Sequence, residues 1–447
     1  MAPTQRQQRT PRPRPRQSAR RQSTRWRRAA WRWARRSRAQ RQEPRRPGLL
    51  RESPRFRYLW LSRTISATGT GVSRVALVLL VASSGPGAVS LVLLCSMLPQ
   101  LLGPVAGAIA DRVDQRRLLA GCEAGQGVIY AVIAATHPPI AALLPLVTVA
   151  GLLATLMSPA GRSSVPRLVA ADRLPRANAL LGLALNLQVI AGPAIGGLLA
   201  GLAGPSAAFA VNAASFAVSA LLLTRLGPLP AHPADGPGGL MTQTWAGLRY
   251  AAHSPILRAL VLGMLVFVSF ASMDNVALVF LVERGMHGSG AEYGAVAAAF
   301  GVGMVAASLA LAARASRRPP AQWLIGGVTL GAVGTAATGL APGIVTASLA
   351  QAAAGAGNTA DLVGTDTLIQ QSVPAPMLGR AFGAVYTAAV AASAIAYAAA
   401  GPLVALAGPR VVFLIAGAGM LAGLAVLAPA LGSGRRASSR PSPPAGV

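Results

Sequence analysis

The sequence predicts an all-α membrane protein in which twelve transmembrane helices form two pseudo-symmetric six-helix bundles. Hydrophobic residues make up 53% of the 447 residues, while the basic residues are concentrated at the N-terminal end. The rest of the chain divides into apolar stretches of about 20 residues, the length that crosses a bilayer as a helix. A short repeat relates the two halves of this apolar region. So few residues of this apolar region are charged that the protein cannot be an ordinary soluble enzyme.

Residues 1–57 form the first segment, an Arg-rich tail. They hold 20 of the 41 basic residues and two acidic ones, a local charge of +18, and lack the apolar residues of a core. We expect a disordered tail, or a gene start placed too far upstream. Alternatively, Trp26, Ala29, Ala30 and Trp33 share one face of a helix that suits anionic lipid. The charge could also attract nucleic acid, but the sequence encodes no nucleic-acid-binding fold, so we expect no such partner.

The first six-helix bundle is predicted over residues 58–225. Its helices are expected at 58–82, 87–110, 118–137, 140–161, 177–201 and 205–224. Gly and Pro inside these stretches would be costly in a soluble helix, but packed membrane helices tolerate them. The following stretch is rich in Pro and Gly, which predicts a cytoplasmic linker over residues 226–253.

The second bundle is predicted over residues 254–431, followed by a cytoplasmic tail over 432–447. Its helices are expected at 256–282, 291–312, 321–340, 343–366, 379–405 and 410–431. The distribution of Arg predicts the orientation. Seventeen Arg residues lie in the C-terminal tail or in loops after even-numbered helices, against two, Arg284 and Arg410, in the other loops. Because cytoplasmic loops carry the excess of basic residues, we expect both termini inside a bacterial plasma membrane.

The two predicted bundles share a repeated segment. Residues 197–209 (GLLAGLAGPSAAF) and 401–413 (GPLVALAGPRVVF) match at seven of thirteen positions, with a constant offset of 204. Two repeats that both begin inside the cell imply a pseudo-two-fold axis along the membrane normal. Such an architecture has its substrate cavity between the repeats, near the middle of the membrane.

The loop between the second and third predicted helices carries a glycine, an aspartate and three arginines at defined spacing: Gly107, Asp111, Arg112, Arg116 and Arg117. This pattern resembles motif A of the major facilitator superfamily, although Asp114 stands where the family usually has Gly. The resemblance implies that the loop contacts the other bundle and favours one access state. The alternative is an ordinary cytoplasmic loop with an excess of basic residues.

The fifth predicted helix carries a glycine–proline pattern formed by Gly192, Pro193, Gly196 and Gly197. It resembles the end of motif C, a signature of antiporters in the same superfamily, and close helix packing is the alternative explanation. Segments such as 211–216 (VNAASF) are similar to the branch that holds enterobactin exporters and macrolide efflux proteins. The Arg that many drug–proton antiporters carry within the fourth helix is absent, since Arg162 lies at the cytoplasmic end of that stretch.

Ionisable residues inside predicted helices are candidates for proton coupling, because burying each in a bilayer costs at least about 2.5–3.5 kcal/mol. Arg74 in the first helix and Asp274 in the seventh are expected to pair across the central axis, and protonation of Asp274 would break the pair. A purely structural ion pair is the alternative. Asp361 is a further candidate, and Asn358 and Thr365 share its helical face. Glu123, five residues into the third helix, is expected to extend to the interface.

Four amides are candidates for the substrate cavity: Asn186, Gln188, Asn275 and Asn358. No metal-ligand cluster, nucleophile–base arrangement or phosphate-binding loop occurs, so we expect no metal, cofactor or enzymatic activity. The chain has no Lys, which excludes the usual ATP-binding loop. We therefore expect a monomeric secondary transporter that exports a hydrophobic or amphipathic small molecule, such as a drug, antibiotic or siderophore, in exchange for protons. The alternatives are an importer or uniporter, or a non-transporting membrane protein whose basic tail recruits a partner.

Overall fold

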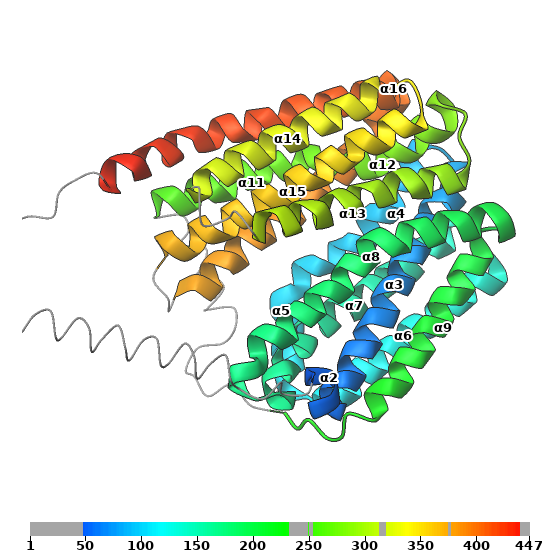
Figure 1. Ribbon diagram of the computed structural model, residues 1–447. Coiled ribbons are helices and arrows are strands. Elements are labelled where there is room, and N and C mark those ends of the chain that lie inside the picture. Colours follow the sequence, from blue (N-terminus) through cyan, green and yellow to red (C-terminus); the bar gives the residue numbers. More distant parts are fainter. Residues whose placement is uncertain (1–47, 232–248, 250–253, 313–318, 374–376, 439–447) are drawn as a thin grey trace, which may run out of the picture. The chain divides into compact units, whose positions relative to one another are not determined.

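The computed structural model describes residues 48–231, 249, 254–312, 319–373 and 377–438, and these residues are helical without any strand (Figure 1). The predicted tail lies outside them up to residue 47, as do most of the predicted linker and residues 439–447. Residues 1–52 and 53–447 form separate compact units. The first contributes only the short helix α2 (Leu49–Glu52), and the second contains everything described below.

The helices follow the predicted order closely. The first bundle consists of α3 (Pro54–Ala82), α4 (Pro86–Met97), η1 (Leu98–Leu102), α5 (Gly103–Arg112), α6 (Gln115–Thr136), α7 (Ile140–Leu168), η2 (Ala171–Arg173), α8 (Leu174–Ala203) and α9 (Pro205–Thr224). The second consists of α11 (Pro255–Ala271), α12 (Asp274–Phe280), η3 (Leu281–Gly285), α13 (Gly290–Ala312), α14 (Pro320–Leu340), α15 (Ile344–Ser372) and α16 (Leu378–Ser438). Several helices are longer than the apolar stretches that predict them, because polar residues continue them at their ends. The single helix predicted over 87–110 is wrong, since this stretch is broken into α4, η1 and α5.

In the described part of the chain, nine helices are long and apolar enough to cross a membrane, or ten if the pair bent by 59° between Pro86 and Arg112 is one span. One of the nine, within α16, is 47 residues long and contains Gly408, whose backbone is not helical. The 29-residue helix α15 is not among the nine, and its polar residues include Gln351, Asn358 and Asp361. An all-helical membrane fold is therefore confirmed, while the number twelve stays a prediction.

The repeat detected in the sequence has a structural counterpart. Gly204 (φ 78°, ψ 165°) separates α8 from α9, and Gly408 (φ 80°, ψ 162°) interrupts α16 at the position 204 residues later. A positive φ favours glycine, and the Pro that follows each glycine starts the next helical segment. Phe209 and Phe413, the last matched residues of the repeat, are both fully buried. The two halves thus use the same turn and the same buried aromatic residue.

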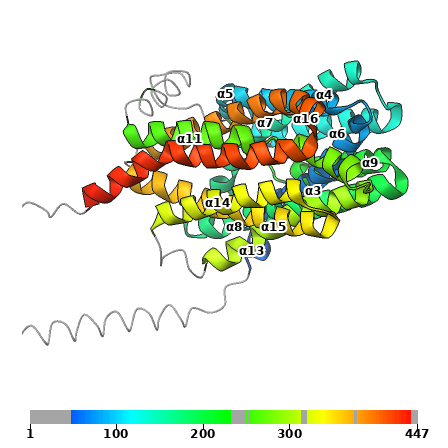
Figure 2. The ribbon, with the colours of Figure 1, turned by 90° about the horizontal axis from the view of Figure 1, so that it is seen from above.

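The two bundles contact each other near one end of the molecule, here called the distal face, where α3 ends at Ala82 and α4 begins at Pro86. The proximal face is the opposite end, where α3 begins at Pro54. Among the helix pairs that join the bundles are α8 with α13 and α4 with α16 (Figure 2). A continuous apolar core contains residues of both bundles at the distal end, including Val78, Val89 and Val279.

At the proximal face, Asp114 begins α6 and also holds the segment that follows α9. Its Oδ1 accepts a hydrogen bond from the Arg117 backbone N–H (2.9 Å), while its Oδ2 accepts one from the Leu229 N–H (3.0 Å). The Gln115 N–H donates to the Leu229 carbonyl (3.0 Å), and Arg167 donates to the Pro230 carbonyl (2.9 Å). The side chain of Asp114 therefore shapes the turn in which the related motif uses a flexible Gly.

Replacing Asp114 with Ala should destabilise the protein, because it removes both the helix cap and the bond to Leu229. Loss of an N-cap costs about 1–2 kcal/mol, and we expect a lower unfolding midpoint for the purified protein in detergent. The Asp114→Asn variant keeps a capping oxygen but loses the second carboxylate acceptor, so its unfolding midpoint should lie between those of the Ala variant and the wild type. Equal midpoints for the Ala variant and the wild type would show that neither bond contributes.

Candidate functional site

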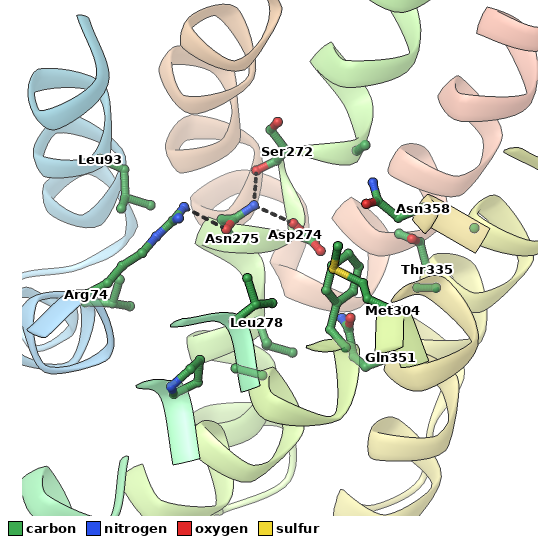
Figure 3. Close-up of a pocket in the computed structure, with 18 of the residues that line it drawn as sticks. Arg74, Leu93, Ser272, Asp274, Asn275, Leu278, Met304, Thr335, Gln351 and Asn358 are labelled. Atoms are coloured by element: carbon green, nitrogen blue, oxygen red, sulfur yellow. Dashed lines mark hydrogen bonds between the residues drawn. The ribbon is translucent and has the colours of Figure 1, made fainter. Parts of the chain in front are cut away.

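A cavity of about 390 Å³ lies between the two bundles. Helices α3, α4 and α8 of the first bundle line it together with α11, α12, α13, α14, α15 and α16 of the second. Its wall is largely apolar, with Phe267, Phe300, Met304 and Met420 on the side of the second bundle. Most of its polar side chains form two groups on this apolar wall (Figure 3).

The first polar group connects the two bundles through Arg74, Asn275 and Asp274. Arg74 Nη2 donates a hydrogen bond to Asn275 Oδ1 (3.1 Å), and Asn275 Nδ2 donates to Asp274 Oδ1 (2.7 Å) (Figure 3). Arg74 Nη2 also donates to the hydroxyl of the buried Tyr397 (3.2 Å). The structure thus places Arg74 and Asp274 near each other, and the hydrogen bonds between the guanidinium and the carboxylate run through Asn275 instead of forming the direct pair that the sequence predicts.

An interruption in the seventh span positions this group. Helix α11 ends at Ala271 and α12 begins at Asp274, which leaves a short break between them. Both helices pack against α16. The hydroxyls of Ser272 and Ser393 are hydrogen-bonded at 2.9 Å, which ties the break to α16. Asn275 Nδ2 donates in addition to the Ser272 carbonyl (3.3 Å), a backbone acceptor near the break. The same break therefore places both the carboxylate and the amide beside Arg74.

The second polar group lies on α14 and α15 and contains Thr335, Gln351 and Asn358 (Figure 3). Gln351 is 1% exposed, and its Nε2 has no hydrogen-bond partner in the described part of the chain. A buried donor without a partner is costly, so this amide is suited to bind an oxygen atom of a substrate. Gln188, on the opposite bundle, also lines the cavity.

Two of the predicted site residues lie elsewhere. Asp361 is buried and accepts a hydrogen bond from the Thr365 hydroxyl (3.3 Å), and its backbone packs against Gly327 of α14. It does not line the central cavity, although α15 also carries Gln351 and Asn358, which do. Asn186 is half-buried on α8 and does not line this cavity either.

Glu123 contradicts the expectation that it extends to the interface, because it is 0% exposed inside the first bundle. Its Oε1 accepts a hydrogen bond from the Ser66 hydroxyl (3.0 Å), and its charge interacts with that of Arg63. Helix α6 begins three residues before the predicted stretch and is capped by Asp114, which places Glu123 more than two turns into the helix. There α6 packs against α9, and Ser66 of α3 and Ser219 of α9 leave room for a carboxylate.

The glycines of the fifth span divide between two interfaces. A Cβ on Gly192 would lie 2.6 Å from Gly71 Cα, and one on Gly196 would lie 2.5 Å from the Val72 carbonyl oxygen, both on α3 of the same bundle. A Cβ on Gly197 would lie 2.6 Å from the Gly290 carbonyl oxygen and 2.7 Å from Gly294 Cα, both on α13 of the other bundle. Gly197 therefore belongs to the distal contact between the bundles, and the first two glycines hold α8 on α3.

The motif A residues lie at the proximal face, where α5 ends at Arg112 and α6 begins. Asp111 and Arg116 are half-buried, and Arg112 and Arg117 are exposed. The hydrogen bonds described for this loop come from Asp114 and Gln115, and Gly107 lies about one and a half turns before the end of α5. Within the described ranges, no three His, Cys, Asp or Glu side chains are grouped so that they could hold a metal ion.

Sequence reasoning missed three residues of these sites: Arg63, Gln351 and Tyr397. The signal for Arg63 is present, since it is a charged residue within a predicted helix. Gln351 could have been found as a polar residue two turns before Asn358 on the same helix. Tyr397 has no such signal, because a Tyr in an apolar helix is common and only the packing of α16 reveals its contact with Arg74.

Comparison with known proteins agrees with this architecture. Residues 50–442 match the family described as transmembrane secretion effector, a family of MFS type. The chain is 29% identical over 395 residues to the uncharacterised MFS-type transporter YfiS of Bacillus subtilis (strain 168), covering 82% of this chain and 92% of YfiS. It is 28% identical over 412 residues to the enterobactin exporter EntS of Citrobacter koseri, covering 89% of this chain and 97% of EntS.

A third relative matches over a shorter region. The multidrug efflux pump Tap of Mycobacterium tuberculosis (strain ATCC 25618 / H37Rv) is 31% identical over 228 residues, covering 47% of this chain and 54% of Tap. Among solved structures, a POT family transporter in complex with 5-aminolevulinic acid superposes with a TM-score of 0.69 at 13% identity, covering 86% of this chain and 98% of that one. The last comparison shows the fold alone. The match over residues 50–442 establishes that the chain belongs to the transmembrane secretion effector family of major facilitator superfamily transporters.

Proposed function

We propose that this transporter exports a hydrophobic or amphipathic small molecule by alternating access, in exchange for protons. The observation that carries the proposal is the central cavity, in which the Arg74–Asn275–Asp274 connection joins the two bundles. Tap is named a multidrug efflux pump and EntS an enterobactin exporter, which supports the direction of transport. The mostly apolar wall fits a substrate with a large apolar body.

The connection offers a physical basis for proton coupling. Arg74 and Asp274 lie on different bundles, and their opposite charges favour the arrangement in which the bundles are linked through Asn275. A proton on Asp274 removes its charge, which weakens this link and shifts the equilibrium between access states. The excess of Arg in the loops of the proximal face supports a cytoplasmic location for that face. With the distal ends in contact, the described state would open its cavity toward the cytoplasm.

Uptake into inside-out membrane vesicles tests the proposal. The dye Hoechst 33342 and the macrolide erythromycin are suitable probes, because one is cationic and aromatic and the other is a large amphipathic molecule. In vesicles that contain the protein, an imposed gradient that is acidic inside should accelerate uptake of a probe at least about tenfold, the equivalent of about 1.4 kcal/mol. Vesicles without the protein are the control.

Two outcomes would decide against the proposal. If the proton gradient does not change uptake, and the probe only moves down its own concentration gradient, the protein is a uniporter. Accumulation in right-side-out vesicles, with none in inside-out vesicles, would indicate an importer.

A further inference from the structure

A second cavity, of about 300 Å³, lies within the first bundle. Its wall comes from α3, α6, α7, α8 and α9, and Gln188 of α8 lines both this cavity and the central one. Two arginines line it, Arg63 and the exposed Arg162. Arg162 lies within α7, which continues to Leu168 beyond the stretch predicted to end at residue 161. The central cavity, in contrast, is lined by a single arginine, Arg74, among the described residues.

The position of Arg63 is built into the bundle. Its Nη2 donates a hydrogen bond to the Met157 carbonyl of α7 (2.9 Å), and it lies directly against Gly161 one turn later. A Cβ on Gly161 would collide with this nitrogen, so the glycine leaves the space that the guanidinium occupies. A guanidinium has five N–H donors, and the bond described for it uses one. The group is therefore held in place with capacity to bind a further acceptor.

The acidic groups nearby lie outside the cavity wall. Glu123 interacts with Arg63, but its Oε2 has no hydrogen-bond partner in the described part of the chain, and the residue is fully buried behind Ser66. Asp366, on the other bundle, accepts a hydrogen bond from the hydroxyl of Tyr386 (3.2 Å). Tyr386 in turn interacts electrostatically with Arg162. The surface that a ligand would touch thus presents two cations and no carboxylate.

The remaining wall combines amides with apolar side chains. Gln126 and Gln188 provide the amides, while Leu181, Leu185 and Phe216 provide an apolar surface. Carboxylates and sulfonates are the natural partners of guanidinium groups, which bind them with paired, charge-assisted hydrogen bonds. An apolar body attached to such a group would fill the rest of the cavity.

We propose that this second cavity binds an amphipathic anion, whose acidic group contacts Arg63 and Arg162 and whose apolar body contacts Leu181, Leu185 and Phe216. This inference rests on the proposed function, because it assigns acidic amphipathic molecules to the substrates of the proposed exporter. Gln188 provides a shared wall between this site and the central cavity. Binding can be measured on the resting protein, so the test does not depend on transport.

The test compares two probes that differ only in charge: 2-naphthoate, and 2-naphthamide, its neutral amide. Each is titrated calorimetrically into the purified full-length protein in nanodiscs of uncharged lipid, with empty nanodiscs as the control. We expect naphthoate to bind about tenfold to a hundredfold more tightly than naphthamide, the range that charge-assisted hydrogen bonds provide.

Four variants locate the site. The double variant Arg63→Gln/Glu123→Gln removes the cation together with the buried carboxylate that would otherwise lose its partner. It should weaken naphthoate binding about tenfold or more. Gly161→Ala should weaken it as well, because it displaces the guanidinium while keeping its charge. Glu123→Gln alone should tighten binding, since it removes the competing negative charge. Arg176→Gln, an exposed arginine outside the cavity wall, is the control for net charge and should change nothing.

Equal affinities for the acid and the amide would overturn the proposal. So would a loss of naphthoate binding in Arg176→Gln as large as in the cavity variants, because this would indicate a general surface effect. If naphthoate does not bind but vesicles transport a dye, the anion site is wrong and the transport function stands. If naphthoate binds with the expected variant pattern and no probe is transported, the proposed export function is wrong and the site stands.

Discussion

Replacing Asp274 with Asn should abolish gradient-driven uptake in inside-out vesicles while leaving exchange of substrate across the membrane intact. Asn keeps an oxygen that can accept the 2.7 Å hydrogen bond from Asn275 Nδ2, but it cannot gain or lose a proton. The cavity should keep its shape, and the link to Arg74 should no longer respond to protons. We expect gradient-driven uptake to fall at least about tenfold, with counterflow of preloaded substrate close to that of the wild type.

Asp361→Asn is the matched control for this experiment. Both aspartates are in helices of the second bundle and accept a side-chain hydrogen bond, but Asp361 is buried outside the central cavity. Its replacement should leave gradient-driven uptake nearly unchanged. The reverse pattern, with loss in Asp361→Asn and normal uptake in Asp274→Asn, would move the coupling site to α15.

Replacing Gly197 with Ala should separate the two bundles at the distal face. The added Cβ would lie within 2.7 Å of backbone atoms of Gly290 and Gly294, which cannot move aside as a flexible side chain could. Such overpacking costs about 1–3 kcal/mol. This corresponds to a change of about 5- to 150-fold in the equilibrium between closed and open distal faces. We expect slower transport and a longer distance between the bundles at this face.

Spin labels at the exposed residues Ser84 and His287, on different bundles, can report the change by double electron–electron resonance. The control is Gly201→Ala, one turn later on α8, where the new Cβ would meet its nearest atom, Ala291 N, at an ordinary 3.5 Å. Only the Gly197 variant should broaden and lengthen the distances. If both variants keep the distance distribution of the wild type, the glycine contact does not determine closure of the distal face.

The sequence was sufficient to predict the order and approximate limits of the helices, because an uninterrupted apolar stretch has few alternatives to a membrane helix. It was also sufficient for the pseudo-symmetry, because Gly204 and Gly408 each need a positive φ that few other residues adopt. The break before Asp274 was not predicted, since Ala271–Met273 contain neither Gly nor Pro. The hydrogen bond between Ser272 and Ser393, which accompanies the break, depends on the packing of α16 and gives no signal in the sequence.

Side-chain partners were harder to predict than positions. Arg74 and Asp274 were identified from their depth in two helices, but the amide between them depends on the rotation of α12. Glu123 was misplaced because its burial depends on Ser66 and Ser219 on other helices, and small residues give no distinct signal in one sequence. Asp361 resembled Asp274 in sequence context, and only the close approach of Gly327 shows that this part of α15 faces α14.

The glycine contact between Gly197 and α13 has a consequence for turnover. Glycine has no side chain whose rotamers must be fixed when the surfaces meet, and the contact described for Gly197 brings no charged groups together at this point. Forming this glycine contact therefore fixes no side-chain rotamers of its own, although the surrounding apolar core must also part when the face opens. The activation barrier of the conformational step should then combine separation of this apolar core with separation of charges at the Arg74–Asn275–Asp274 connection. A transporter built in this way can close its distal face repeatedly with the same backbone fit, because no side chain at Gly197 has to find its rotamer each time.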